Sequence, residues 1–413
     1  MREKCEFVAP CHFGLESVCK REITDLGYEI VQVEDGKVTF TGDVEALVRA
    51  NIFLRTTQRI IWKVGEFKAT SFEELFQNIK NIPWEDYLPQ DARFWVTKAT
   101  SVKSQLFSTS DIQSIAKKAM VERMKQHYHV NWFEEDGQDY PVRISIYKDV
   151  VTIGLDTSGE SLHKRGYRRM VSKAPIEETL AAGLIKLTPW RKDRILVDPF
   201  CGSGTFPIEA AMIGANIAPG MKRTFQGQQW ENLIPAKLWQ KGFEEAEDLV
   251  DLSVDMDIQG YDIDPQIVKA ARENAKRAGV DSLIHFQQRP VHKLRHPKKY
   301  GFIITNPPYG ERLEEKEDMP ALYREIGEAF SHLDDWSEFV ITAYEDAERY
   351  IGKKATKNRK IYNGMMKTYF YQFQGPKPPR RRDDRPLTET ERQRDRDGAG
   401  QRHTARDGKG GEK

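Results

Sequence analysis

The sequence predicts an α/β protein in which an N-terminal α+β module precedes a doubly wound, seven-stranded sheet. Three observations carry this prediction. The first 66 residues alternate strand and helix patterns in the order βαββαβ. A glycine-rich turn, residues 198–205, joins a short apolar strand to a helix. Strand and helix patterns then alternate until Asn363-Gly364, a hairpin dipeptide near the end of the chain.

Length, charge and cysteine content limit the kinds of protein that this chain can be. The 413 residues suffice for two or three domains, and 64 Lys and Arg balance 63 Asp and Glu. Any basic surface that binds a polyanion must therefore be a local patch, because the chain as a whole carries almost no net charge. The sequence contains no run of eighteen apolar residues, so no membrane span is predicted. The N-terminus lacks the apolar segment of a signal peptide, and we therefore expect a cytoplasmic protein. The four cysteines match no zinc spacing, and we expect no metal site.

The first domain is expected over residues 1–66. Its alternation of apolar residues predicts the strands Cys5–Ala9, Glu29–Glu34, Lys37–Thr41 and Arg59–Val64. One helix is expected over Gly14–Leu26, and Asp43 is expected to cap a second. This order of elements is that of the ferredoxin-like motif, which implies a fold but no activity.

A second α+β domain is expected over residues 67–160. Ser71 caps its first helix, and a second helix covers Ser110–Gln126. The strands are Arg93–Ala99, Val142–Tyr147 and Val150–Asp156. The expected loop 98–106 carries Lys98, Lys103 and several hydroxyls, which suit phosphate contacts without base readout; a solvated polar loop explains it equally well.

The third domain is expected over residues 161–375 and begins with a basic stretch, residues 162–169. Its Lys164, Arg165 and Arg168 could hold a phosphate backbone at a domain junction, or the stretch could be a solvated linker. A helix over Ile176–Leu187 follows.

The glycine-rich turn follows the buried strand Ile195–Asp198. Gly202, Ser203 and Gly204 lead into the helix that begins near Thr205. A strand, a Gly-x-Gly turn and a helix N-terminus together form an anion-binding nest. The turn alone is weak evidence, because many α/β proteins have tight turns and the third glycine of the dinucleotide fingerprint is absent.

An acid closes the next strand, Ile258–Asp262. Such a residue is the expected acceptor for ribose hydroxyls. Asp262 lies 60 positions beyond Gly202 instead of the usual distance of about 20. The excess, residues 216–257, is read as an insertion that walls the substrate site or as a plain helical excursion.

Asn306-Pro307-Pro308-Tyr309 follows the apolar strand 301–305. The two prolines end the strand because neither has an N–H, so Asn306 and Tyr309 stand in a stiff turn at its carboxyl end. Open α/β sheets bind ligands there. A planar amine could donate to the Asn306 side-chain oxygen and the Pro307 carbonyl, while Tyr309 stacks on the attached ring. Alone, the motif is also an ordinary turn.

The remaining patterns complete the sheet. Further strands are expected over Leu283–Gln287, Glu338–Thr342, Lys357–Tyr362 and Met365–Phe373, with helices over Gln266–Ala278 and Leu322–Leu333. Five parallel strands and the two strands of a terminal hairpin make a sheet of seven strands. Residues 376–413 hold twelve Lys or Arg and eight Asp or Glu with almost no large apolar side chain, and we expect a disordered charged tail.

Two motifs in register carry a family resemblance. Residues 198–205 together with 306–309 resemble class I S-adenosylmethionine-dependent methyltransferases that act on exocyclic or amide nitrogen. Residues 162–168 and 174–182 look like the junction of the THUMP-domain RNA methyltransferases, and the N-terminal order looks like their ferredoxin-like plus THUMP module. The likeness spans about residues 1–375. It is strongest to the bacterial enzymes that make N2-methylguanosine in 23S ribosomal RNA.

The resemblance assigns roles to residues of this chain. It implies a Rossmann-like methyltransferase domain, S-adenosylmethionine as cofactor and RNA as partner. The cofactor would be held by Asp198, Cys201, Gly202, Ser203, Gly204, Thr205, Asp262, Ile263, Gln288 and Asn306. Gln288 stands where many relatives carry an acid toward the adenine amine. The target base would be held by Asn306, Pro307, Pro308 and Tyr309, and RNA by Lys98, Lys103, Lys164, Arg165 and Arg168.

Several alternatives remain within and outside methyl transfer. A transfer-RNA guanine-N2 enzyme has the same order of modules. Adenine N6 methylation and protein glutamine methylation use the same Asn-Pro-Pro-Tyr logic, although the N-terminal module argues against DNA and glutamine. A non-catalytic RNA-binding ribosome-assembly factor is the alternative from another class, and the intact glycines and Asn306 argue against it.

Overall fold

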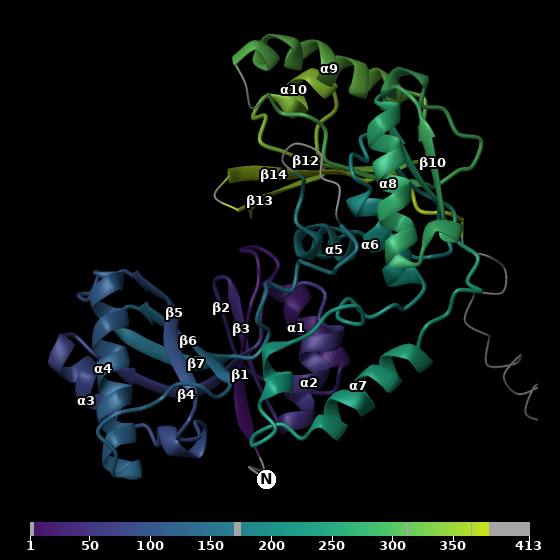
Figure 1. Ribbon diagram of the computed structural model, residues 1–413. Coiled ribbons are helices and arrows are strands. Elements are labelled where there is room, and N and C mark those ends of the chain that lie inside the picture. The colour runs from purple at the N-terminus through teal and green to yellow at the C-terminus, as the bar shows by residue number, and fades with distance from the viewer. Residues whose placement is uncertain (1–3, 169–174, 311–312, 365, 380–413) are drawn as a thin grey trace, which may run out of the picture. The chain divides into compact units, whose positions relative to one another are not determined.

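The computed structural model describes residues 4–168, 175–310, 313–364 and 366–379. The chain divides into two units, and the described residues up to Gly375 belong to the first, compact one. The described part of the first unit contains two seven-stranded sheets (Figure 1). Disorder is expected over residues 376–413, of which residues 380–413 lie outside the described residues, as do Arg169 of the basic stretch and Met365 of the last strand.

The first sheet begins with the predicted βαββαβ order, which is confirmed. Its elements are β1 (Cys5–Pro10), α1 (Glu16–Asp25), β2 (Glu29–Glu34), β3 (Lys37–Gly42), α2 (Val44–Phe53) and β4 (Ile61–Lys68). Gly36, with φ of 76°, makes the tight turn between β2 and β3. Asp43 caps α2 as predicted, accepting from the Ala46 N–H at 2.9 Å.

The second domain extends the same sheet. Its elements are α3 (Phe72–Lys80), β5 (Arg93–Val102), α4 (Thr109–Tyr128), β6 (Asp139–Tyr147) and β7 (Val150–Asp156). The strand order is β2-β3-β1-β4-β7-β6-β5, and β4 pairs with both β1 and β7. The two N-terminal domains therefore share one continuous sheet, with β4 as the strand common to both.

The loop predicted over residues 98–106 is partly wrong. Strand β5 continues to Val102, because it pairs in parallel with β6 along its whole length up to Val102 opposite Tyr147. Lys98 thus lies in an edge strand, whereas Lys103 follows the strand with a positive φ of 53°. Both lysine side chains are exposed.

The second sheet is the predicted doubly wound sheet. Its strands are β8 (Leu196–Asp198), β9 (Ile258–Asp262), β10 (Ile284–Gln288), β11 (Phe302–Thr305), β12 (Ser337–Thr342), β13 (Lys357–Asn363) and β14 (Met366–Phe373). They lie in the order β10-β9-β8-β11-β12-β14-β13. The first five are parallel, and β14 pairs antiparallel with both β12 and β13.

Helices cover both faces of this sheet (Figure 1). On one face lie α5 (Glu178–Leu187), α6 (Thr205–Gly214) and α8 (Pro265–Ala278), which share a hydrophobic core with Leu196 and Ile304. On the other lie α9 (Leu313–Ser331) and α10 (Ala347–Ile351), which share a second core with Val197 and Ile303. Neighbouring residues of β8 and β11 thus enter opposite cores, as expected for strands buried on both faces.

The sequence leaves open whether the insertion walls the substrate site or is a plain helical excursion, and none of its residues lines the cavity beside Asp198 described below. Residues 216–257 contain α7 (Ala236–Asp248) and belong with the N-terminal domains. Glu245 of α7 takes both bonds of a bidentate pair from Arg49 of α2, the shorter at 2.7 Å. Trp230 stacks on Tyr140 of β6 with ring centroids 5.0 Å apart and is fully buried. The insertion thus connects the methyltransferase domain to the N-terminal domains.

Helix α9 begins earlier than predicted. It starts at Leu313, although the pattern indicated Leu322, and it contains Pro320. The run of charged residues 314–318 carries no apolar periodicity, and a proline normally marks a helix boundary. Leu322, the first residue of the predicted helix, therefore lies in the interior of α9.

Candidate active site

A cavity of about 880 Å³ opens where the order of the second sheet reverses. Strands β8 and β11 are neighbours there, although they are the first and fourth strands of the domain along the chain. Their carboxyl ends deliver Asp198 and the 306–309 turn to the same cavity. Open α/β sheets bind ligands at such a switch point. The two motifs singled out in the sequence therefore face each other across one cavity.

The glycine turn forms the floor of the cavity. Gly202 and Gly204 have φ of 53° and 88°, a conformation that side chains disfavour. The Gly204 N–H donates to the Cys201 carbonyl at 2.8 Å, and Asn274 donates to the Ser203 carbonyl at 3.1 Å. A Cβ on Gly204 would lie 3.1 Å from the Phe286 ring. The turn is thus fixed against α8 and β10, with its N–H groups at the start of α6.

Asp198 is the buried charge of the site. Its carboxyl is 1% exposed and accepts from the Thr305 hydroxyl at 2.6 Å and from the Phe200 N–H at 3.1 Å. Burial raises the pKa of Asp198 to about 7, and these two donors oppose the shift. A bound cation would therefore be favoured beside it. S-adenosylmethionine carries such charges on its ammonium and sulfonium groups.

Asp262 and Ile263 end the neighbouring strand β9. The Asp262 carboxylate accepts from the Gly202 N–H at 3.2 Å and from the Asp264 N–H at 3.0 Å, which leaves further lone pairs for hydroxyl donors. Burial raises its pKa. Ile263 is 71% exposed although it lines the cavity. An exposed aliphatic side chain beside a carboxylate fits a nucleoside, with the base on Ile263 and the ribose on Asp262.

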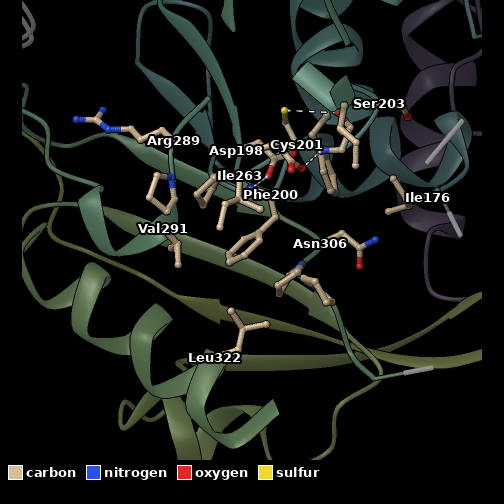
Figure 2. A pocket seen from close by; sticks show the side chains of 18 of the residues that line it. Ile176, Asp198, Phe200, Cys201, Ser203, Ile263, Arg289, Val291, Asn306 and Leu322 are labelled. Atoms are coloured by element: carbon tan, nitrogen blue, oxygen red, sulfur yellow. Dashed lines mark hydrogen bonds between the residues drawn. The ribbon is translucent and has the colours of Figure 1, made fainter. Parts of the chain in front are cut away.

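The Asn-Pro-Pro-Tyr turn forms the opposite wall. Asn306 and Tyr309 are half-buried, Pro307 is buried, and all three line the cavity. The Pro308 carbonyl accepts from the Tyr323 hydroxyl at 3.1 Å, and that hydroxyl also contacts the Thr342 hydroxyl at 2.5 Å. Tyr323 therefore anchors the turn to α9 and β12. In Figure 2 the Asn306 amide is directed away from the side chains of Asp198 and Cys201.

Sequence reasoning missed several lining residues. They come from the segment before α5, from α8, from the segment after β10 and from α9: Pro175, Ile176, Ile267, Arg289, Val291, His292, Leu322 and Glu325. The His292 Nδ1 lies 2.7 Å from the Glu325 carboxylate, within hydrogen-bonding distance. In Figure 2 the Arg289 guanidinium points away from the other side chains, consistent with its position over the Tyr261 ring at 5.1 Å. The spacing of Leu322 and Glu325 on one helical face was the available signal.

Two of the predicted cofactor residues, Gly204 and Gln288, are not among those that line the cavity. The Gln288 amide donates to the Ile263 carbonyl at 3.1 Å, so its support of the site is indirect. Cys201 lines the cavity, but burial raises its thiol pKa well above the usual range, so a nucleophilic thiolate is disfavoured.

The basic stretch divides into exposed and buried side chains. Lys164 is exposed and pairs with Glu160 at 2.9 Å. Arg165 is 3% exposed and donates to the Arg55 carbonyl at 2.6 Å, so its enclosed guanidinium argues against the predicted contact with RNA. Arg168 is half-buried and donates to the Thr205 hydroxyl at 2.8 Å, so it supports the cofactor turn.

Comparison with protein families places the three parts of the chain. Residues 6–61 match the RlmL ferredoxin-like domain, residues 69–156 the THUMP domain, and residues 165–372 the RMKL-like methyltransferase domain. "Putative RNA methyltransferase YpsC" of Bacillus subtilis is 47% identical over 92% of this chain and 98% of its own length. "Ribosomal RNA large subunit methyltransferase K/L" of Desulfotalea psychrophila is 33% identical over 88% of this chain. The match spans only 52% of that longer protein.

Solved structures agree with the fold. A possible methylase from Clostridium difficile 630 has a TM-score of 0.88 with 50% identity, and the match covers 92% of this chain and all of that one. "SMU.472, a putative methyltransferase complexed with SAH" has a TM-score of 0.85 with 42% identity over 92% of this chain and all of that one. SAH is what S-adenosylmethionine becomes after it loses its methyl group.

The fold, the glycine turn and the Asn-Pro-Pro-Tyr turn together define a class I methyltransferase whose methyl donor is S-adenosylmethionine. None of the helices in the described ranges has the length and apolarity to span a membrane. The chain belongs to the family of RlmL-like, THUMP-containing RNA methyltransferases.

Proposed function

We propose that the protein methylates the exocyclic N2 amine of a guanosine in 23S ribosomal RNA. The observation that carries the proposal is the pair of acceptors in the turn: the Asn306 side chain and the Pro307 carbonyl border the same cavity as the cofactor turn. A planar amine has two N–H donors, which matches two acceptors. The relatives named for large-subunit ribosomal RNA support the choice of RNA, although the chain spans only about half their length.

The methyl transfer depends mainly on how the target amine is oriented toward the methyl group. The lone pair of the guanine N2 amine is delocalised into the ring, and hydrogen bonds to Asn306 and Pro307 would localise it on nitrogen. S-adenosylmethionine, when bound, supplies an electrophilic methyl group. Asp198, Asp262 and the 202–205 turn would hold it, and Tyr309 would stack on the target base. Orientation and electrostatics of this kind account for large rate effects without a covalent nucleophile.

RNA chemistry distinguishes the proposal from its rivals. We expect mass spectrometry of RNA from cells lacking the protein to find one N2-methylguanosine missing from 23S RNA, with re-expression restoring it. Loss from transfer RNA alone would favour the transfer-RNA enzyme instead. Loss of N6-methyladenosine would show that the turn serves an adenine amine.

The role of Asn306 is tested separately. Asn306→Ala should abolish methyl transfer while S-adenosylmethionine still binds with the affinity of the wild type, measured by calorimetry. Asn274→Ala is the contrasting variant, because Asn274 holds the Ser203 carbonyl of the cofactor turn. That variant should weaken cofactor binding. Full activity of Asn306→Ala would refute the assignment.

A further inference from the structure

A second cavity, of about 1220 Å³, lies beside the first. It is lined by two segments that are far apart in the sequence, residues 158–168 after the THUMP domain and residues 222–229 of the insertion, together with Glu178 at the start of α5. Neither segment has a role in the site described above, apart from Arg168. The cavity is large enough for a nucleotide and is open to solvent on one side.

One side chain connects the two cavities. Arg168 lines the second cavity, and its Nη2 donates at 2.8 Å to the Thr205 hydroxyl and at 2.8 Å to the Ile176 carbonyl, both of which belong to residues lining the first. Arg168 also pairs with Glu178 at 3.0 Å. A polymer lying in the second cavity would therefore pass within one side chain of the first.

The walls of the second cavity are held rigidly. Arg223 donates through Nη1 to the carbonyls of Ser161 and Lys164 and through Nη2 to those of Ser158 and Glu160, at 2.7 to 3.3 Å. One guanidinium thus binds four carbonyls of the opposite segment. A site formed in advance loses little entropy when a ligand binds.

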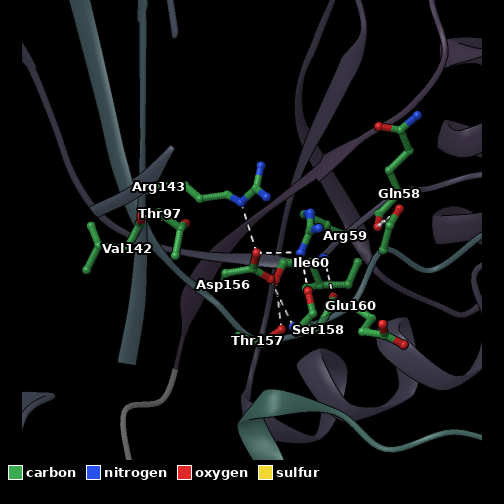
Figure 3. Close-up of polar contacts among 12 residues, drawn as sticks. Gln58, Arg59, Ile60, Thr97, Val142, Arg143, Asp156, Thr157, Ser158 and Glu160 are labelled. Carbon is green, nitrogen blue, oxygen red and sulfur yellow. Dashed lines mark hydrogen bonds and ion pairs between the residues drawn. The ribbon is translucent and has the colours of Figure 1, made fainter. Parts of the chain in front are cut away.

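The same segment is anchored to the THUMP domain at its start (Figure 3). Asp156, the last residue of β7, pairs with Arg59 at 2.7 Å and with Arg143 at 2.9 Å. Two residues further on, the Ser158 hydroxyl accepts from the Ile60 N–H at 2.8 Å. The cavity wall is therefore a direct continuation of the RNA-binding module, fixed by buried polar contacts.

The lining has the chemistry of a nucleic-acid site. Basic residues outnumber acidic ones in the lining: Lys164, Arg168, Lys222 and Arg223, with the enclosed Arg165, against Glu160 and Glu178. Lys164 and Lys222 are exposed, as phosphate contacts require. Three glutamines add amide groups that can pair with base edges, and Gln226 donates to Gln229 at 3.1 Å.

We propose that the second cavity holds the nucleotide next to the target in the RNA strand, with Lys164 on its phosphate and Gln229 at its base edge. The proposal rests on RNA being the substrate of the first cavity. The proposal gives a role to the insertion that interrupts the methyltransferase domain, because the insertion supplies one wall of the site for the RNA strand. The flanking nucleotide would be fixed while the target base enters the first cavity.

The test uses the full chain and a mixed-sequence, single-stranded oligoribonucleotide. Binding is measured by fluorescence anisotropy at several salt concentrations. In Lys164→Ala, the slope of log K against log salt should become shallower by about 0.7, the value for one lost single-strand phosphate contact. Lys241→Ala is the matched control, since Lys241 is another exposed lysine in an ion pair, with Glu45 at 2.8 Å, outside both cavities. Its slope should equal that of the wild type.

A second variant tests occupancy without changing charge. Gln229→Trp fills the cavity from an exposed position, so it should raise KM for RNA while S-adenosylmethionine affinity, measured by calorimetry, stays at the wild-type value. Equal salt slopes for Lys164→Ala and Lys241→Ala, or an unchanged KM in Gln229→Trp, would overturn the proposal. The anisotropy assay measures binding and needs no methylation. Its result therefore stands even if 23S RNA proves not to be the substrate.

Discussion

The Thr305 hydroxyl donates a 2.6 Å hydrogen bond to the Asp198 carboxylate, and this bond joins the last residues of β11 and β8. Each strand leads directly into one of the two turns of the site. The bond therefore fixes the turn that holds the cofactor relative to the turn that holds the target amine. Both residues are fully or almost fully buried, so water does not compete for the bond.

Removal of this bond should cost stability. Thr305→Val keeps the shape of the side chain but leaves a buried carboxyl with one donor fewer, and we expect a loss of about 1–3 kcal/mol in the free energy of unfolding. Thr305→Ser keeps the hydroxyl and should lose less. Urea titrations of both variants measure the difference, and equal values for the two would show that the hydroxyl contributes nothing.

Asp198 should make stability depend on pH. Its pKa is raised to about 7 by burial, against an ordinary value of 3.8, so the native state binds its proton more tightly than the unfolded chain. The stability that Asp198 contributes is fully present below about pH 4 and is lost as the pH rises to about 7, by at most about 1.4 kcal/mol per pH unit.

Asp198→Asn removes this titration. Without cofactor, the variant should gain stability relative to the wild type between pH 5 and pH 8, as measured by urea unfolding at each pH. The exposed Asp281 serves as control, and Asp281→Asn should run parallel to the wild type. A wild-type curve parallel to that of Asp198→Asn would contradict the expected titration.

The glycine turn can be tested with a paired substitution. Gly204 and Gly27 have φ of 88° and 92°, but only at Gly204 would a Cβ have close neighbours, the Phe286 ring at 3.1 Å and the Ala271 Cβ at 3.2 Å. Gly27→Ala should cost only the backbone strain, roughly 1–2 kcal/mol. Gly204→Ala should cost more because of the added contacts, and it should weaken cofactor binding. Thermal unfolding and calorimetry measure both effects.

Tyr323 should act as a positioning residue. Tyr323→Phe removes the hydroxyl that binds the Pro308 carbonyl, so the target turn loses an anchor while the cofactor turn keeps all its contacts. We expect kcat to fall about tenfold, since small misplacement of reacting groups is costly, with KM for S-adenosylmethionine unchanged. Tyr344→Phe is the control, because its ring lies 4.9 Å from that of Tyr323 and leaves the bond to Pro308 intact. Equal loss in both variants would indicate a packing effect.

Residues at strand ends were predictable from the sequence, and residues at packing interfaces were not. Asp198, Asp262 and Asn306 each follow a short apolar strand, so a local pattern combined with the rule for parallel sheets brings them to one edge. The caps at Asp43 and Ser71 are local as well, and both are present. The same local signals identified the hairpin between β13 and β14.

Arg165 illustrates the limit. In sequence it is one cation among several in an exposed-looking basic run, but it is enclosed by Glu209 of α6 and by the Arg55 carbonyl, partners that are remote along the chain. Nothing local distinguishes it from the exposed Lys164. The insertion presents the same difficulty, because an aromatic such as Trp230 would suit a substrate wall as well as the stack on Tyr140 that it makes.

The shared strand β4 determines how this protein can be recombined with its relatives. Because β4 pairs with β1 on one side and β7 on the other, a cut between the first two domains would expose the edges of a divided sheet. Trp230 and Glu245 of the insertion would also lose Tyr140 and Arg49. A chimaera meant to change RNA choice should therefore exchange two separate stretches at once, residues 4–168 and residues 216–257.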